Sequence, residues 1–347
     1  MPRFKRRDVL IAASAVYASV ALRAAAGSGD SNPLGGWREA LLVVRDAAPW
    51  IETLTSVGGW EVAWRGNPDS GLNLLWSLPA TARSQQTLMR NTGTHSGYIR
   101  LVTVTGAPQE KIRPNDQAWE SGGISALDVR VLDIESTRKA LQLRGWNGPA
   151  DPIRYTTYGF DVVQWAPRSP DGVRLSFIQR IAPPLAGWDE LKFWSRATNA
   201  AIIVKDMSIA QSFVTAGLGL KQISQSNTVG SGGPNVMGLP WLLNAHLKTD
   251  IRGFAGIPAG DGAIEFISMP EAQGRDFAER AHPPNLGLAG LRFMVDDVAA
   301  LAQRLATHGF APLRPIQTMQ IAPYGDVGAL GLSSIDGVWF EFVQLGH

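Results

Sequence analysis

One short phrase occurs four times along this chain, and no other feature limits its possible folds as strongly. Each copy is a β-rich run, an Asp, an amphipathic stretch, and a Gly followed by a hydrophobic residue. The copies begin at Glu39, Ala126, Asn199 and Gly290. Self-similarity of this length is the signature of a repeated supersecondary unit. We therefore expect four copies of one structural unit.

Each copy predicts the same local structure. The β-rich run is typical of a strand, and the Asp can cap the first turn of a helix. The Gly can end that helix in the left-handed conformation. Each copy then closes with a strand led by Gly, as in "GYIRLVTV", "GVRLSFIQR", "GAIEFISM" and "GVWFEFVQL". In the last copy Val298, Leu301 and Leu305 recur at helical spacing, which predicts one apolar helix face against a sheet.

The domain organisation follows from the sheet face that a single unit would leave exposed. A single unit would leave a sheet face open to water, so the units should pair. The segments that separate the units are rich in Pro, Gly and charge, as connectors are. The simplest pairing joins the first unit with the second, over residues 37–182, and the third with the fourth, over residues 192–346. The predicted class is α+β, with two curved-sheet domains.

Residues 1–27 precede the first unit and have the layout of an export signal. A basic head that includes Arg6 and Arg7 is followed by an apolar run and a small-residue exit. The adjacent arginines favour a twin-arginine signal, and hence a periplasmic location. The alternative is an uncleaved N-terminal membrane anchor, although the run is short for a stable span. No later stretch is long and apolar enough to cross a bilayer, so we expect no stable membrane span once the signal is removed.

Composition excludes several classes of function. The sequence pI near 9.0 suggests nucleic-acid binding, but five of the 32 Lys and Arg residues lie in the signal with only one of the 30 acids. The remaining chain is slightly acidic, so we expect no nucleic-acid partner. The absence of Cys excludes disulfides, thiolate nucleophiles, Cys-ligated zinc and iron–sulfur clusters. No G-x-S-x-G elbow or P-loop is present.

The repeated strand–helix–strands order resembles the vicinal oxygen chelate superfamily, which includes glyoxalase I, the bleomycin resistance proteins and the extradiol dioxygenases. The resemblance is strongest in "FMVDDVAALAQRLATHGF" and "IDGVWFEFVQ" of the fourth unit. It implies four βαβββ modules that form two glyoxalase-like half-barrel domains. It also implies a divalent metal ion in the cup of a curved sheet, whose identity the sequence leaves open.

The family places its metal ligands at two kinds of position, the head of the first strand, commonly His, and the last strand, commonly Glu. The head positions in this chain are Glu39, Ala126, Asn199 and Gly290. The last-strand positions are Arg100, Ser176, Glu265 and Glu341. None of the heads is His. This departure argues against glyoxalase I itself and against an extradiol dioxygenase.

The resemblance divides the chain into two halves. Glu39 and Arg100 predict an ion pair rather than a metal site, and Ala126 and Ser176 cannot hold a metal. The N-terminal pair of units is therefore predicted to be structural or a partner surface.

The C-terminal pair is predicted to hold the site. Glu341 and Glu265 would bind the metal with Asn199 or His246, and the gap at Gly290 would be filled by water, substrate or a histidine. Alternation along the last strand predicts that Glu341 faces the cup. Glu341 is also the candidate catalytic residue, since it could leave the metal to move a proton. For each carboxylate the alternative is a solvated side chain, and for Asn199 and His246 an ordinary structural residue.

Three further residues are candidate substrate contacts. Asn235 and Trp241 lie in the Gly-rich segment "GSGGPNVMGLPW" of the third unit, which is either a loop edging the cup or a plain connection. Tyr324, in "PYGDV", stands at the matching place in the fourth unit.

Two functions remain open at this stage. The first is an exported, divalent-metal-dependent lyase, isomerase or dioxygenase that acts on a small oxygen-bearing, aromatic or non-aromatic molecule. The second is a metal-free protein that binds or sequesters a small molecule on the same fold. Both have a small-molecule partner, and both allow a homodimer.

Overall fold

The structure is a computed structural model that describes residues 34–68, 70–115, 117–188, 191–230, 232–256, 262–272, 274–312 and 314–346. The predicted export signal, residues 1–27, lies outside this part of the chain.

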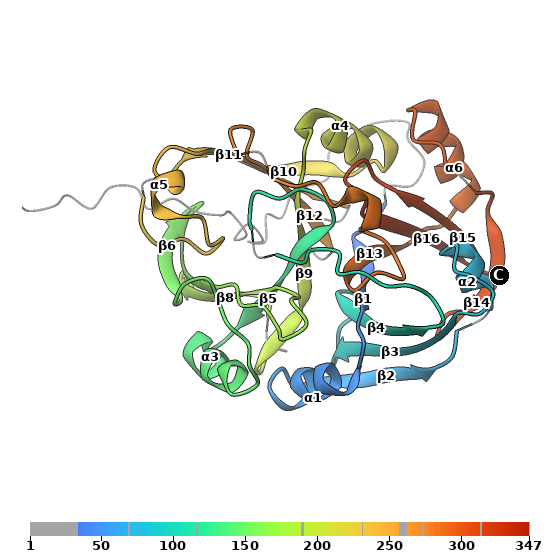
Figure 1. Ribbon diagram of the computed structural model, residues 1–347, viewed down its shortest axis with the longest axis horizontal. Helices are drawn as coiled ribbons and strands as arrows, with labels where there is room; N and C mark the ends of the chain where they lie inside the picture. Colours follow the sequence, from blue (N-terminus) through green and yellow to red (C-terminus); the bar gives the residue numbers. More distant parts are fainter. Residues whose placement is uncertain are drawn as a thin grey trace, which may run out of the picture.

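The first two units begin the chain in the predicted order (Figure 1). The first contains β1 (Trp37–Val43), α1 (Ala48–Ser56), β2 (Trp60–Gly66), α2 (Ser70–Leu75), β3 (Arg83–Asn91) and β4 (Tyr98–Thr105). The second contains β5 (Ile124–Val131), α3 (Ile134–Gln142), β6 (Ile153–Thr157), β7 (Phe160–Trp165) and β8 (Leu175–Ala182).

The last two units repeat this order. The third contains β9 (Trp194–Ile203), α4 (Met207–Ser212) running into a π-helical turn at Phe213–Gly217, β10 (Lys221–Val229), α5 (Trp241–Asn244), β11 (Lys248–Ala255) and β12 (Ala263–Ser268). The fourth contains β13 (Gly287–Met294), α6 (Val298–Thr307), β14 (Gln317–Ile321), β15 (Gly325–Ser333) and β16 (Trp339–Leu345). A 3₁₀ turn at Ala278–Arg280 precedes the fourth unit. The predicted fold class is confirmed.

The predicted helix starts are confirmed in three units. Asp133, Asp206 and Asp297 each accept hydrogen bonds from the two backbone N–H groups that an N-cap satisfies. In the first unit the N-cap is Ala47, and Asp46 accepts only from the Ala48 N–H, at 2.9 Å. The helix stops are left-handed glycines in all four units. They are Gly59, Gly145, Gly219 and Gly309, with φ between +70° and +83°.

The sixteen strands in the described residues form two eight-stranded sheets. Sheet one has the order β14-β15-β16-β13-β1-β4-β3-β2, and sheet two has the order β10-β11-β12-β9-β5-β8-β7-β6. Sheet one therefore joins the first unit to the fourth through the antiparallel pair β1 and β13, and sheet two joins the second to the third through β5 and β9. We call the concave face of sheet one cup one, and that of sheet two cup two.

The predicted pairing, first unit with second over 37–182 and third with fourth over 192–346, is therefore wrong. Polar groups at the centres of the joining strands give a physical reason. In the observed pairing Glu39 lies opposite Arg292, and Asp128 lies opposite Asn199. Joining the first unit to the second in the same register would set Glu39 against Asp128, which buries two carboxylates side by side.

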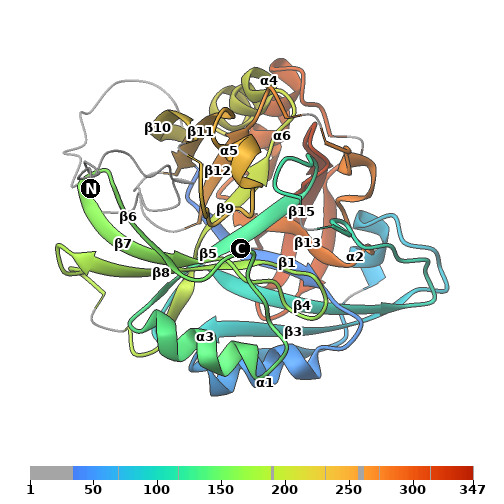
Figure 2. The ribbon, with the colours of Figure 1, turned by 60° about the vertical axis from the view of Figure 1, so that its left-hand side comes forward.

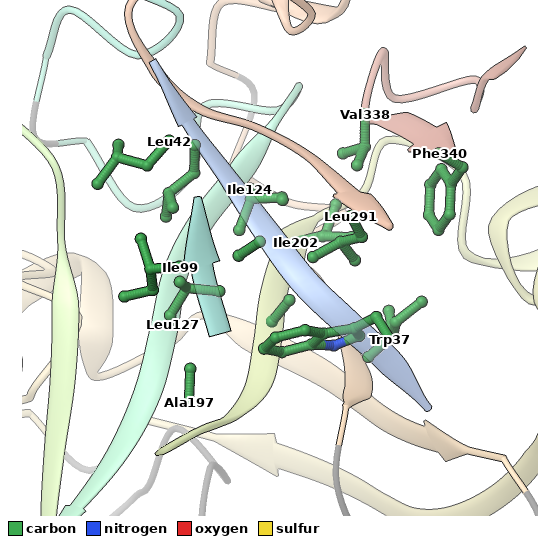
Figure 3. Close-up of a cluster of buried hydrophobic side chains, with 14 of the residues drawn as sticks. Trp37, Leu42, Ile99, Ile124, Leu127, Ala197, Ile202, Leu291, Val338 and Phe340 are labelled. Atoms are coloured by element: carbon green, nitrogen blue, oxygen red, sulfur yellow. The ribbon is translucent and has the colours of Figure 1, made fainter. Parts of the chain in front are cut away.

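The two sheets pack back to back over one hydrophobic core (Figure 3). Leu42, Ile99 and Leu291 contribute from sheet one, and Leu127 and Ile202 contribute from sheet two. The next residue along each strand points into a cup instead, as the two-residue period of a strand requires. The shared core therefore fixes which side chains face each cup.

The helices cover the ends of this arrangement in two pairs, α1 beside α3 and α4 beside α6 (Figures 1 and 2). Arg144 Nη2 lies 2.7 Å from Glu52 Oε1 across the first pair. In the second pair Arg304 Nε donates to the Gly217 carbonyl at 2.9 Å. Val298, Leu301 and Leu305 form the buried face of α6, as predicted. No helix in the described ranges combines the length and hydrophobicity that crossing a membrane requires.

Candidate functional site

Cup one is crossed by a chain of buried ion pairs. Arg100 donates to both carboxylate oxygens of Glu39, with Nε–Oε2 at 2.6 Å and Nη2–Oε1 at 2.8 Å. Arg292 then bridges the two acids, with Nη1 at 2.7 Å from Glu39 and Nε at 2.7 Å from Glu341. All four side chains are at most 1 % exposed. The predicted Glu39–Arg100 ion pair is confirmed, and it extends to two further residues that the sequence did not connect with it.

Neutral donors add further hydrogen bonds to the two carboxylates of cup one. Tyr324 donates its hydroxyl to Glu39. Trp76 and Trp339 both donate their indole N–H groups to Oε1 of Glu341, the second at 2.9 Å. Glu341 does face the cup, as predicted, and Phe340 packs in the shared core behind it.

The charge balance of this network holds Glu39 ionised. Burial alone would raise the pKa of Glu39, but the guanidinium groups of Arg100 and Arg292 lower that pKa to about 2. Burial and the adjacent Glu39 carboxylate raise the pKa of Tyr324, so its hydroxyl keeps its proton and remains a donor.

Side chains also fill the rest of cup one. Leu72 and Leu75 of α2 and the following Trp76 pack with Val102 and Val343 of the sheet. The gap predicted at Gly290 does not exist, because a Cβ there would lie 2.4 Å from the Trp339 carbonyl oxygen. Neither water, substrate nor a histidine takes that place, since the neighbouring strand occupies it.

The donors of cup one do not fit a divalent metal ion. A metal would need carboxylate oxygens that are now held by guanidinium groups, and it would approach two fixed positive charges. In cup one the negative charges of the two carboxylates already balance the positive charges of the two arginines.

Cup two has a different centre. Asp128 of β5 and Asn199 of β9 are 1 % and 3 % exposed, and Asn199 Nδ2 donates to Asp128 Oδ2 at 2.9 Å. The second oxygen of each side chain, Oδ1, is buried without a hydrogen-bond partner. Nearby, Gln164 Nε2 donates to the Ser176 hydroxyl at 2.7 Å. Two adjacent buried acceptors without donors are costly, and they are the kind of group that a bound molecule satisfies.

Burial changes the acidity of this centre. The pKa of Asp128 is raised to about 6 by burial, although the neighbouring Asn199 and Ser176 side chains and the charge of Arg130 act in the opposite direction. The pKa of Tyr155 is raised by burial and by the carboxylates of Asp128 and Glu265. Asp128 is therefore a carboxyl group that can exchange a proton near neutral pH.

A cavity opens from this centre along the rim of cup two. The space that it offers to the centres of water-sized molecules is about 80 Å³, and it is partly open to solvent. Asp128, Gln164 and Ser176 lie in its wall together with Ala126 and Ala201. Ligand sites in proteins are commonly concave surfaces of this kind, lined by apolar groups and a few polar ones. We call it the cup-two cavity.

The predicted metal ligands do not converge. Glu341 lies in cup one, whereas Glu265 and Asn199 lie in sheet two. His246 is exposed on the turn after α5. The prediction of one site built from these four residues is wrong, because it assumed that the third and fourth units share a sheet.

The predicted substrate contacts are also dispersed. Asn235 is buried in its own turn, where it bonds to the backbone of Leu239 at 2.8 and 2.9 Å. Its neighbour Met237 lines the cup-two cavity. Trp241 is 64 % exposed on α5. Tyr324 does reach a cup, but it is cup one.

The donors of cup two form an incomplete metal site. Asn199 offers an amide oxygen, and Asp128 and the buried Glu265 offer carboxylates, which suit a hard cation that needs six to eight oxygens. The nearby Arg130 guanidinium opposes a second cation at Asp128. Within the part of the chain that the structure describes, no three His, Asp or Glu side chains gather closely enough to hold a metal ion. These residues do not fit the divalent metal predicted for the cup.

Sequence reasoning missed Asp128, because it placed the second unit's head position at Ala126. Both side chains face cup two, two residues apart. The pairing of β5 with β9 shifts register between Ile124 and Ala126 and again between Asp128 and Val129, which brings Asp128 opposite Asn199. A charged residue in the middle of the apolar run "ALDVRVL" was the available signal.

Comparisons with known proteins agree with this architecture. Residues 196–342 match the family model "Glyoxalase/Bleomycin resistance protein/Dioxygenase superfamily". No curated protein sequence matches the chain. Among solved structures, the chain is similar to glyoxalase I from Zea mays, with 12 % identity and a TM-score of 0.58 over 89 % of this chain and 92 % of that one.

A second similar structure is a proposed dioxygenase from Bacillus subtilis subsp. subtilis. The identity is 14 % and the TM-score is 0.54, over 90 % of this chain and 86 % of that one. At these identities the likeness is one of fold. The sequence match therefore covers the last two units, and over most of the chain the protein shares its fold with these glyoxalase and dioxygenase structures.

Proposed function

We propose that the protein binds a small oxygen-bearing molecule in the cup-two cavity, and that it does so without a metal ion. One contrast carries this proposal: cup one is closed by ion pairs and α2, whereas cup two keeps a cavity with Asp128 in its wall. The buried acceptor oxygens of Asp128 and Asn199 suit a hydroxyl or amine donor on the ligand.

The donor chemistry supports the metal-free form of the proposal. In cup one the carboxylates are bound by arginines, and in cup two the candidate ligands are the carboxylates of Asp128 and Glu265 and one amide, with the Arg130 guanidinium acting on Asp128. Elemental analysis of the dialysed protein tests this form. Stoichiometric retention of a divalent metal at micromolar protein concentration would contradict it.

Binding itself can be tested with a cavity-filling variant. A library of small alcohols, phenols and hydroxy acids is screened against the wild type by ligand-observed NMR. Ala126→Leu should abolish the hits, because Ala126 lines the cavity and the added side chain occupies it. Trp241→Ala, outside the cavity lining, should keep them. The proposal fails if both variants, shown folded by circular dichroism, bind like the wild type.

A proton-transfer enzyme is the second candidate function. It is favoured by Asp128, which lies in the cavity wall with a pKa raised to about 6, as a general base working near neutral pH requires. Asp128→Asn should abolish deuterium incorporation into a bound ketone while leaving its binding within about threefold. Equal incorporation by the variant and the wild type would remove Asp128 from that role.

Export to the periplasm through residues 1–27 is a separate part of the proposal. It is supported by the basic head, the Arg6-Arg7 pair and the apolar run. Fusion of these residues to a reporter, with Arg6→Lys and Arg7→Lys together as the comparison, tests it. Export that is unaffected by the double change would reject the twin-arginine route.

A further inference from the structure

The outer wall of the cup-two cavity carries a group of basic side chains that the proposed function does not use. Lys111 and Arg113 come from the connector between β4 and β5, and Arg168 and Arg174 come from the segment between β7 and β8. All four line the same cavity as Asp128. We call these four residues the basic rim.

Backbone carbonyls hold the three arginines of the rim in place. Arg113 Nη1 donates to Gly122 O at 2.9 Å, and Arg174 Nη1 donates to Ala166 O at 2.6 Å. Arg168 Nε donates to Gly172 O at 2.9 Å, and its Nη2 donates to the carbonyl of Arg113 at 3.1 Å. These bonds fix the guanidinium groups close together before any ligand arrives.

The rim concentrates positive charge in a half-buried place. The cavity lining contains two acids, Asp128 and Asp171, whose Oδ2 already accepts from Trp50 at 2.9 Å. Outside the lining, the buried Glu120 carboxylate also acts on Arg113 and Arg168, so four cations stand against three acids. Burial and, after it, repulsion from Arg113 lower the pKa of Arg174 to about 10. A bound anion relieves both effects, since it supplies the charge that solvent cannot provide there.

The lining of the cavity also includes apolar side chains. Ile124, Ile203, Val236, Met237 and Ile267 contribute to it. A ligand that fits therefore needs a hydrophobic body as well as a charged end.

We propose that the cup-two cavity takes an amphipathic organic anion, a carboxylate or a phosphate ester. Its charged group lies against Arg113, Arg168 and Arg174, its apolar body covers Ile203 and Met237, and a hydroxyl or similar donor reaches Asp128. This inference rests on the proposed function, because it specifies the ligand class of the same cavity.

Three probes that share one ring test the charge preference by calorimetry: 1-naphthoate, 1-naphthyl phosphate and the neutral 1-naphthalenemethanol. At least one anion should bind the wild type about tenfold more tightly than the alcohol, since a charge-assisted hydrogen bond contributes about 1.5–3 kcal/mol. Comparison of the two anions distinguishes a carboxylate from a phosphate site. Added salt should weaken the anions and leave the alcohol unchanged.

Variants assign the effect to the rim. Arg174→Gln should weaken the preferred anion about tenfold without affecting the alcohol, and Arg174→Lys should restore most of the loss. Lys111 is exposed, so Lys111→Gln provides a second charge removal that does not disturb folding. Arg90→Gln, on the exposed Arg90–Glu61 pair, is the control and should change nothing.

The outcomes separate the two proposals. If the alcohol binds as tightly as both anions, or if the rim variants match Arg90→Gln, the anion inference is overturned and cavity binding stands. If none of the probes binds the folded wild type, the cavity proposal is overturned together with it.

Discussion

At the scale of single residues, the two cups use equivalent strands for opposite purposes. In cup one Glu39 and Glu341 are bound by Arg100 and Arg292, and the charges cancel. In cup two Asp128 faces an amide and keeps one oxygen without a donor. The balanced ion pairs of cup one can stabilise the fold, whereas the free acceptor of cup two could accept a hydrogen bond from a ligand.

Removing the central charge of cup one should destabilise the protein strongly. In Glu39→Gln two buried guanidinium groups lose their shared partner, which costs about 3–5 kcal/mol of unfolding free energy. Urea unfolding at pH 7 measures this. Glu61→Gln, on an exposed pair, should cost less than about 1 kcal/mol. Equal effects would mean that the buried network adds no more than a surface ion pair.

The raised pKa of Asp128 predicts a pH dependence of stability. Between the ordinary carboxyl pKa near 3.8 and the folded value of about 6, the unfolded chain has lost this proton and the folded chain retains it. Stability therefore falls as pH rises through that range, by about 3 kcal/mol from this group. Asp128→Asn should gain stability relative to the wild type between pH 4 and pH 7, as chemical denaturation at both pH values would show.

The matched control for this pH dependence is Asp151→Asn, which removes an exposed carboxylate. Its stability should follow that of the wild type across the range. If Asp128→Asn also runs parallel to the wild type, Asp128 does not keep its proton in the folded state.

Part of this chemistry was predictable from sequence. Strand alternation placed Glu341 in a cup, and opposite charges at equivalent positions identified the Glu39–Arg100 pair. Arg292 and Asp128 were not predictable, because their partners lie on units far along the chain and their register depends on strand irregularities. A repeat pattern predicts which side chains of a strand lie on each face of the sheet, but it does not predict which side chains of another strand lie opposite them.

At the scale of elements, α2 is the feature that makes cup one unlike cup two. It is an insertion between the second and third strands of the first unit, and with Trp76 it packs inside the cup and contacts β14. The repeat did not predict it, since only the third unit has a helix, α5, at the matching place and the second and fourth units have none.

Trp76→Ala should reopen cup one. Loss of this buried ring is expected to cost about 3–5 kcal/mol and to leave a void that binds indole. Trp76→Phe keeps most of the ring and removes only the N–H bond to Glu341, so it should cost less and bind no indole. Unfolding in urea and NMR titration with indole measure the two effects. An unchanged stability in Trp76→Ala would show that α2 does not close the cup.

The helix caps permit a comparison within one chain. Asp297→Ala removes a side chain that accepts from two N–H groups, and should cost about 1 kcal/mol. Asp46→Ala removes a single bond at a helix whose N-cap is another residue, and should cost less. Thermal unfolding of both variants measures the difference, and a larger loss for Asp46→Ala would contradict the assignment.

At the scale of the whole molecule, the two halves of the chain are interlocked. Each sheet takes one unit from either side of the connector that follows β8, so neither half contains a complete sheet. Fragments 34–186 and 187–347 should be unstructured when expressed separately and should recover structure when co-expressed. Circular dichroism and size-exclusion chromatography would show this. Two fragments that each fold alone would instead support tandem domains.

The sequence was sufficient for the unit, its order and its boundaries, because these depend on local periodicity, caps and turns. It was not sufficient for the pairing of units, since all four first strands carry similar apolar runs. The choice depends on a few polar contacts between Glu39 and Arg292 and between Asp128 and Asn199.

This interlocking sets an order of events during synthesis. One edge of β1 stays unpaired until β13 is synthesised, some 250 residues later. The strands β5 and β9 are separated by a much shorter stretch of chain, so they can pair earlier. Sheet two can close around its cavity while sheet one is half made, and contacts so distant in sequence form slowly. The sheet that holds the cup-two cavity would then be complete before the sheet that holds the ion-pair network.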